Sequence, residues 1–142
     1  VNEYVKPGRL RLDFRGLAFL GSDSVKAMRI ALAAGKQNKL WDVVGLFYAN
    51  QGEENSGWVT DAKIDEILAQ VPGLNVAKVK KDAQSAAITS QIEQLSAEAT
   101  QNGVQGTPSF FIARGVNQPY PVQVNSLTPD GFRPVLNDAL AG

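Results

Sequence analysis

The chain contains no cysteine and no histidine among its 142 residues. Without cysteine it can form no disulfide, and it offers no thiolate as a nucleophile or metal ligand. Without histidine it lacks the side chain that most often serves as an acid, a base or a metal ligand near neutral pH. There is also no glycine-rich phosphate loop and no serine-nucleophile motif. The sequence therefore predicts no catalytic residue, no metal and no cofactor.

One short segment could still bind a ligand. Gly106, Thr107 and Pro108 stand directly before an apolar run, Ser109–Ala113, which has the pattern of a buried strand. A proline fits the start of a strand because it has no N–H to donate to the ladder. A cis Thr107–Pro108 bond would leave the backbone N–H and C=O of Thr107 free to pair with an extended peptide. The alternative is a trans proline that merely opens the strand, and the residues alone leave both open.

Charge and composition exclude several other classes of function. The 14 basic and 14 acidic residues balance to a net charge of zero, which argues against a surface made for nucleic acid or anionic membranes. The longest apolar run is a handful of residues, so we expect no membrane span. Neither an initiator methionine nor a recognisable secretory signal opens the chain. We therefore expect the start to have been processed, trimmed or left out.

The first residues predict a short helical end followed by a strand. Residues 1–6, followed by the stop signal Pro7-Gly8, have the pattern of the last turn of a helix. Polar and apolar residues alternate strictly over residues 9–14, which is typical of a strand with one buried face. That face would carry Leu10, Leu12 and Phe14.

A block of about five helices is expected from about residue 22 to about residue 101. Ser22, Thr60 and Asn75 are candidate N-caps, because their side chains can accept a hydrogen bond from the first turn. Trp41 and Tyr48 flank the apolar stripe of the second helix. We expect aromatic residues at that spacing to belong to the core rather than to a ligand site.

The last third of the chain returns to strands. Ser109–Ala113 predicts a strand buried on both faces, and Tyr120–Val124 an antiparallel return strand held at the sheet edge by its prolines. Thr128 and Pro129 would start a final helix. The order of strand, helices, two strands and helix predicts an α/β fold in a single domain, residues 1–142.

Segments spread over most of the chain match one known pattern in their order and spacing. They are Leu12-Asp13-Phe14-Arg15, Leu17-Ala18-Phe19-Leu20-Gly21, Asp23-Ser24, Ala31-Leu32-Ala33-Ala34-Gly35, Lys39-Leu40-Trp41, Leu46-Phe47-Tyr48-Ala49-Asn50-Gln51, Glu54-Asn55-Ser56-Gly57-Trp58 and Gly103-Val104-Gln105-Gly106-Thr107-Pro108-Ser109-Phe110-Phe111-Ile112. On these residues the chain resembles the DsbA-like branch of the thioredoxin superfamily. The resemblance implies a thioredoxin-like fold with residues 22–101 as its helical insertion. It also implies that Pro108 is the cis proline beside the active site and that Thr107, with Gly106, touches substrate peptide.

The chain departs from the family in one respect. The resemblance implies a strand and a C-x-x-C motif ahead of Arg9, and this N-terminal β-α unit is missing from the sequence. Thiol–disulfide exchange needs an attacking thiolate, so we expect the chain itself to be inactive. The missing strand would lie between residues 9–14 and 109–113 and would leave both edges unpaired. We expect a complementing N-terminal segment, a partner chain in a strand-exchanged dimer, or a rearranged pairing to fill that gap.

Three functions remain open on the sequence. The leading one is the C-terminal portion of a DsbA-like protein thiol–disulfide oxidoreductase, acting on extended peptides or unfolded proteins in the periplasm or outside the cell. The alternative is a redox-inactive thioredoxin-fold module that only binds peptides. The third is a structural domain in which Thr107-Pro108 does no more than start a strand.

Overall fold

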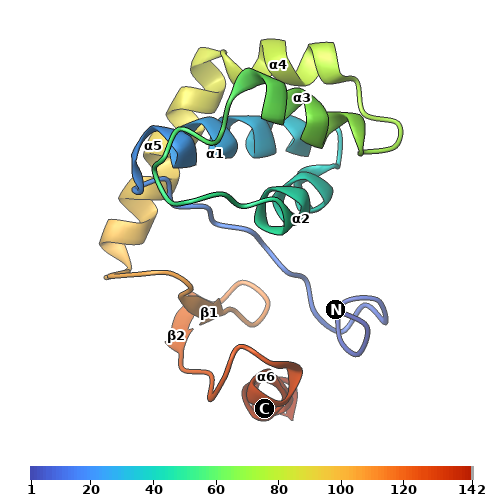
Figure 1. Cartoon of the computed structure of the whole chain (residues 1–142). Coiled ribbons are helices and arrows are strands. Elements are labelled where there is room, and N and C mark those ends of the chain that lie inside the picture. Colours follow the sequence, from blue (N-terminus) through green and yellow to red (C-terminus); the bar gives the residue numbers. More distant parts are fainter. Residues whose placement is uncertain (142) are drawn as a thin grey trace. The chain divides into compact units, whose positions relative to one another are not determined.

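The computed structural model describes residues 1–141, and its contacts divide the chain into two compact units, Val1–Gln101 and Asn102–Gly142. The described part of the first unit is helical: α1 (Gly21–Gly35), α2 (Leu40–Ala49), α3 (Asp61–Ala69), α4 (Val76–Ala83) and α5 (Ala86–Gln101). The second unit carries the strands β1 (Phe110–Ile112) and β2 (Tyr120–Val122) and the helix α6 (Pro129–Ala141) (Figure 1). From residue 21 onward this element order is the one that the sequence predicts.

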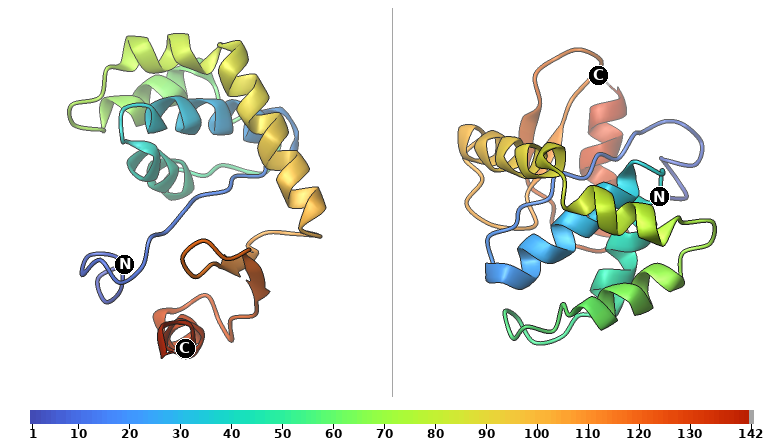
Figure 2. Two further views of the ribbon diagram at one scale, coloured as in Figure 1. Left: turned by 180° about the vertical axis from the view of Figure 1, so that it is seen from behind. Right: turned by 90° about the horizontal axis from the view of Figure 1, so that it is seen from above.

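The hydrophobic core lies in the helical unit. Helix α1 packs against α2, α4 and α5, and α3 bridges α2 and α4 (Figure 2). The run Ala31–Ala34 on α1 is buried, and its small side chains let the neighbouring helices approach closely. The largest fully buried side chains are Ile67, Leu68, Ile88, Val43, Val59 and Val79. By contrast, no hydrophobic side chain in residues 102–141 is fully buried.

Two of the three predicted N-caps are confirmed. Thr60 Oγ1 accepts a hydrogen bond from Lys63 N–H at 3.1 Å, and Asn75 Oδ1 accepts one from Lys78 N–H at 2.9 Å. The prediction for Ser22 is wrong, because α1 begins one residue earlier at Gly21 and its N-cap is Leu20. No side chain caps the first turn of α1, although Ser24 Oγ accepts the N–H of the N-cap residue Leu20 at 3.1 Å.

The N-terminal residues form turns with hydrogen bonds like those at a helix C-terminus, but the first helix of the described residues is α1, so the predicted helix end stays a prediction. Val5 N–H donates to Val1 C=O at 2.9 Å, which is the bond of a helical turn. Gly8 N–H then donates to Val5 C=O and Arg9 N–H to Tyr4 C=O, both at 2.9 Å. This pair of bonds is the Schellman motif, and Gly8 supplies the left-handed conformation it requires, with φ +75°. The chain leaves this turn as an extended segment.

The predicted strand at residues 9–14 is wrong. These residues form no ladder with any described part of the chain, and the sheet consists of β1 and β2 alone. Leu10 and Phe14 are half-buried, as their alternation predicts, but Leu12 is 46% exposed. A period of two reports which side chains face the core, whereas a strand also needs a hydrogen-bonded neighbour. The rearranged pairing of this segment with residues 109–113 is likewise not observed.

The prediction that Trp41 and Tyr48 lie in the core is also wrong. Phe47 is buried, whereas Trp41 is 48% and Tyr48 69% exposed. The buried face of α2 carries Val43, Val44 and Phe47. At 100° per residue, Trp41 and Tyr48 fall at the edge of that face, so neither is enclosed. Phe14 covers part of Trp41: the two rings meet edge-on, with their centroids 5.6 Å apart.

A buried carboxylate ties α1 to the loop before α3. Asp23 lies in the first turn of α1 and is 3% exposed. Its Oδ2 accepts the Gly57 N–H at 2.8 Å, whereas its Oδ1 has no hydrogen-bond partner among the described residues. Asp23 therefore links the first turn of α1 to the backbone at Gly57.

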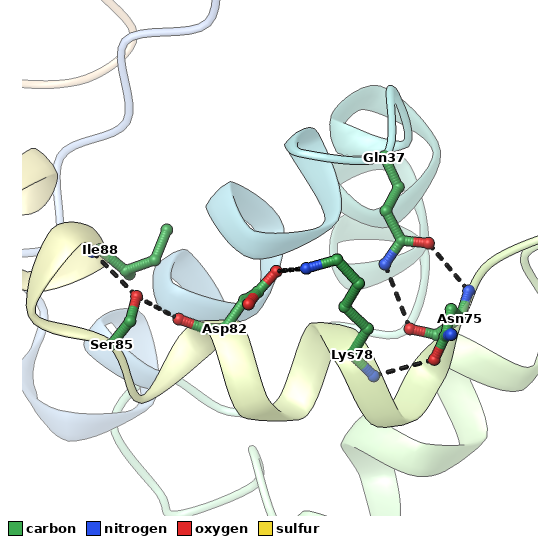
Figure 3. Close-up of polar contacts among 6 residues, drawn as sticks. All are labelled: Gln37, Asn75, Lys78, Asp82, Ser85 and Ile88. Carbon is green, nitrogen blue, oxygen red and sulfur yellow. Dashed lines mark hydrogen bonds and ion pairs between the residues drawn. The ribbon is translucent and has the colours of Figure 1, made fainter.

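A chain of polar contacts joins the end of α1 to α4 and α5 (Figure 3). The Gln37 amide donates to Asn75 C=O at 3.2 Å and accepts the Asn75 N–H at 2.9 Å. Lys78 Nζ donates to Asp82 Oδ2 at 2.7 Å. Ser85 Oγ donates to Asp82 C=O at 2.6 Å. The two Gln37 bonds hold the start of α4 against the end of α1, although Gln37 and Asn75 are far apart in the sequence, and the other two bonds lie within α4 and the turn that follows it.

Asp82 gives this turn a pH dependence. The hydrogen bond from Lys78 and the positive charges of Lys78, Lys36 and Lys81 hold the pKa of Asp82 below its usual value, although desolvation opposes them. A pKa that is lower in the folded state adds stability above the unfolded value, near 4, and that stability is lost as the pH falls through the folded value. We expect the stability difference between the natural chain and Asp82→Asn to shrink from about pH 5 to about pH 2.

Thermal unfolding of both chains across this range measures that difference. The variant Lys78→Met removes the hydrogen-bond donor and the nearest charge, and should lose the larger part of this pH-dependent stability, whereas Lys36 and Lys81 remain. A difference between the natural chain and Asp82→Asn that stays constant over the range would contradict the assignment.

Candidate functional site

The strands β1 and β2 form an antiparallel hairpin that positions the candidate site. Phe110 lies opposite Val122, Phe111 opposite Pro121 and Ile112 opposite Tyr120. The predicted return strand is confirmed, in a shorter form. The prediction that β1 is buried on both faces is wrong, because all three of its residues are only half-buried. Among the described residues β1 has a neighbour on one side only, so its other edge carries no partner strand.

Helix α6 supports the hairpin through two contacts. The Phe110 and Phe132 rings meet edge-on with their centroids 4.9 Å apart. Arg114 Nη2 donates to the Asp138 C=O at 3.0 Å, near the end of α6 where backbone carbonyls lack helical partners. These contacts fix both ends of β1 against the helix. They therefore hold the segment that leads into β1.

That leading segment contains the three predicted site residues. Helix α5 ends at Gln101, and Gly106, Thr107 and Pro108 follow in a bend immediately before β1. All three are exposed. The peptide bond between Thr107 and Pro108 is cis. Ser109 Oγ donates to the Gly106 C=O at 2.6 Å and closes the bend. The structure thus brings the three residues together on the surface, and their binding role stays a prediction.

The surroundings of the bend suit an uncharged ligand. Within the described residues, neither the N–H nor the C=O of Thr107 has a hydrogen-bond partner. A side-chain carbon placed on Gly106 would meet no atom within 4 Å, so the space beside it is open. No ionisable side chain occurs from residue 101 to residue 113. The bend can therefore offer backbone hydrogen bonds, the hydroxyl groups of Thr107 and Ser109 and apolar contact, without a charged side chain.

Residues 1–141 were compared with the requirements of a metal cluster and of a membrane-spanning helix, and they meet neither. No group of three or more aspartate or glutamate side chains in residues 1–141 is arranged to bind a metal ion. In the same part of the chain, no helix is both long enough and apolar enough to cross a membrane.

Comparison with known proteins decides the family. The model of the DSBA-like thioredoxin domain matches residues 6–127, which is most of the chain. The chain belongs to the DSBA-like thioredoxin domain family. The mixed fold, with its helical block between residues 21 and 101 and its small sheet, is therefore a DSBA-like thioredoxin fold.

Two curated relatives support this assignment. The probable disulfide bond formation protein D of Bacillus cereus is 29% identical over 120 residues, which cover 82% of this chain and 56% of the relative. The protein of the same name from Bacillus anthracis is 28% identical over 120 residues, covering 82% of this chain and 55% of that relative. The chain thus spans little more than half the length of these disulfide bond formation proteins.

Two polar residues with structural roles are not singled out by the sequence analysis. Arg114 is one of them, and its guanidinium donates a hydrogen bond to α6. The sequence around Arg114 gives little indication of this role, because the carbonyl that it binds is 24 residues away along the chain. Asp23 was noted only for its match to the family pattern. A carboxylate in the first turn of a helix is common on surfaces, and nothing local indicates that Asp23 is buried.

Proposed function

We propose that this chain is the substrate-binding, C-terminal portion of a DsbA-like protein thiol–disulfide oxidoreductase that forms or isomerises disulfides in exported proteins. The observation that carries the proposal is the family match over residues 6–127, which includes the Gly106–Pro108 bend. The names of the two Bacillus relatives support it. In this proposal residues 1–142 form one incomplete domain, and the block at about 22–101 is the helical insertion.

The chemistry of such an enzyme sets the role of this part. A cysteine thiolate attacks a disulfide sulfur, a mixed disulfide forms, and a second thiolate resolves it, so that two thiols are oxidised for each disulfide reduced. This chain has no cysteine, so the thiols must come from outside it. Its own contribution is to hold an extended substrate peptide beside them. Disulfides persist in oxidising compartments, which supports a periplasmic or secreted location.

Thr107 is the proposed contact with the peptide backbone. Its N–H and C=O lie next to the open space at Gly106, and an extended peptide can pair with such groups as an added strand. Pro108 would shape the bend and keep Thr107 beside the open space at Gly106. The same arrangement suits unfolded proteins, because they present extended backbone regardless of sequence.

Peptide binding should depend on residue 107. We expect Thr107→Arg to weaken binding of a fluorescein-labelled, unstructured, cysteine-free peptide by about tenfold, because a long charged side chain would fill the site. Fluorescence anisotropy measures the affinity. Gln118→Arg adds the same charge in the turn between β1 and β2, and it should leave the affinity unchanged. Equal binding by the natural chain and Thr107→Arg would count against a peptide contact at Thr107.

The absence of both cysteine and histidine also favours a second candidate, a redox-inactive module that binds peptides. A designed strand, C-x-x-C and helix unit joined ahead of Val1 separates the two. If the chain is the substrate-binding part of an oxidoreductase, the joined protein should oxidise a reduced two-cysteine peptide faster than the unit alone. A binding module would bind the peptide with no gain in its oxidation.

A further inference from the structure

Asn102 is followed by a glycine in an exposed turn directly after α5. The helix ends at Gln101, and both Asn102 and Gly103 are exposed. Gly103 has a φ of +66°, the left-handed conformation that commonly ends a helix. A side-chain carbon placed on Gly103 would meet no atom within 4 Å. The peptide nitrogen next to the Asn102 side chain therefore lies in open space.

An asparagine side chain can react with the peptide nitrogen that follows it. The Gly103 nitrogen would attack Cγ of Asn102 and form a new C–N bond. The bond from Cγ to the side-chain nitrogen would break, and that nitrogen would leave as ammonia with the proton from Gly103. Water then opens the resulting succinimide ring at one of its carbonyl carbons and leaves aspartate or isoaspartate. Each event consumes one water and releases one ammonia, with nothing oxidised or reduced, and asparagine counts among the thermolabile residues.

The hydrogen bonding of the backbone distinguishes Asn102 from other asparagines of the chain. Among the described residues, no backbone C=O accepts the Gly103 N–H. After three other asparagines, the next N–H donates to a backbone carbonyl and must lose that bond before its nitrogen can turn and attack. These asparagines are Asn38, Asn50 and Asn55, and the bonds run from Lys39 to Ala34 at 3.1 Å, from Gln51 to Tyr48 at 3.4 Å and from Ser56 to Glu53 at 3.3 Å.

The residue that follows also distinguishes Asn102. Every other asparagine in the sequence precedes a residue with a side chain, which crowds the attacking nitrogen, whereas glycine permits a close approach. Asn117 is the best internal comparison, because it is exposed in the loop between β1 and β2 and no described backbone C=O accepts the Gln118 N–H. It differs from Asn102 in the side chain of the next residue.

The product would place a negative charge directly after the end of α5. The last carbonyl groups of a helix carry partial negative charge, so a carboxylate there is unfavourable. Helix α5 has no basic residue in its last turn to offset it. Isoaspartate would in addition lengthen the main chain by one carbon atom, four residues before Gly106. Either product changes a segment that has no ionisable side chain from residue 101 to residue 113.

We propose that Asn102 is a site of self-modification, at which the Gly103 nitrogen displaces the side-chain amide and leaves aspartate or isoaspartate, and that the new charge destabilises the end of α5. The reaction needs only water and the chain's own atoms. It is separate from thiol–disulfide exchange and from peptide binding at Thr107.

Peptide mapping by mass spectrometry tests the reaction during incubation of the full chain at mildly alkaline pH. We expect the peptide that contains Asn102 to gain about 1 Da, as an amide becomes an acid. This gain should appear at least about tenfold faster than at Asn117. In water labelled with oxygen-18 the product should carry one heavy oxygen. Asn102→Gln should abolish the early gain, because its longer side chain closes the ring poorly. An unchanged Asn102, or equal rates at Asn102 and Asn117, would overturn the proposal.

The effect of the new charge is tested without waiting for the reaction. We expect Asn102→Asp to lower the midpoint of thermal unfolding by about 1–4 °C, because the carboxylate meets the negative end of α5. Asn117→Asp adds the same charge away from any helix end and should shift the midpoint by less than about 1 °C. Equal midpoints for the two variants would contradict the effect on α5. Neither measurement uses peptide binding, so this proposal and the proposed function can fail separately.

Discussion

Leu68→Ala is expected to destabilise the chain by about 2–5 kcal/mol, the range found for large-to-small substitutions in well-packed cores. Leu68 is 0% exposed on α3, next to the equally buried Ile67. Helix α3 contacts both α2 and α4, so the surrounding side chains are held from two directions and can collapse only partly into the space. This cost is a large fraction of the total free energy of unfolding, which is only about 5–15 kcal/mol for a whole domain.

Denaturant unfolding followed by far-ultraviolet circular dichroism measures this loss. Ile67→Val removes a single methyl group and should cost about 0.5–1.5 kcal/mol, which keeps the test informative if Leu68→Ala does not fold. Leu127→Ala is the matched control, because Leu127 is 66% exposed and such substitutions usually change stability by less than about 0.5 kcal/mol. A Leu68→Ala cost no greater than that of Leu127→Ala would mean that α3 is not part of the core.

The helical unit was predictable because its signals are local. Thr60 and Asn75 accept hydrogen bonds from residues three positions ahead, so both partners lie in one short stretch of sequence. The buried residues of α3 recur at helical spacing. The failure at Ser22 shows the limit of this reasoning. Ser22 lies inside the first turn of α1, because the N-cap is Leu20, and where the chain enters a helix is not set by a serine alone.

The errors concern partners that are distant in sequence. The alternation in residues 9–14 correctly indicated an extended chain with two unlike sides, but a strand exists only with a neighbour, and no local pattern states who that neighbour is. Trp41 and Tyr48 have the hydrophobicity of core residues, yet their burial depends on what covers α2. The candidate site has the same limit. The sequence places Thr107 and Pro108 before β1, but no local pattern shows whether a peptide binds there.

Gly131→Ala is expected to destabilise the second unit by about 1–3 kcal/mol or more, the usual cost of overpacking. Gly131 lies in the first turn of α6 and is the buried residue of that helix. A side-chain carbon at this position would lie 2.2 Å from the Ser126 C=O oxygen and 2.5 Å from its backbone nitrogen. Backbone atoms cannot move aside as a flexible side chain can, so the loop between β2 and α6 would have to shift. That shift would pull α6 and Phe132 away from Phe110 on β1, and with it the support of the Gly106–Pro108 bend.

Gly45→Ala is the same type of substitution, but we expect it to stabilise the chain. Gly45 lies in α2, and a side-chain carbon there meets no atom within 4 Å, so alanine should stabilise the chain by about 0.5–1 kcal/mol through its better helix propensity. Hydrogen exchange measured by mass spectrometry separates the two effects. Gly131→Ala should speed exchange in peptides covering residues 110–141 and leave α3 and α4 unchanged, and it should weaken peptide binding at Thr107. Gly45→Ala should slow exchange in α2 alone. If Gly131→Ala exchanges like the natural chain, the tight approach of Ser126 does not constrain α6, and the hairpin must owe its position to other contacts.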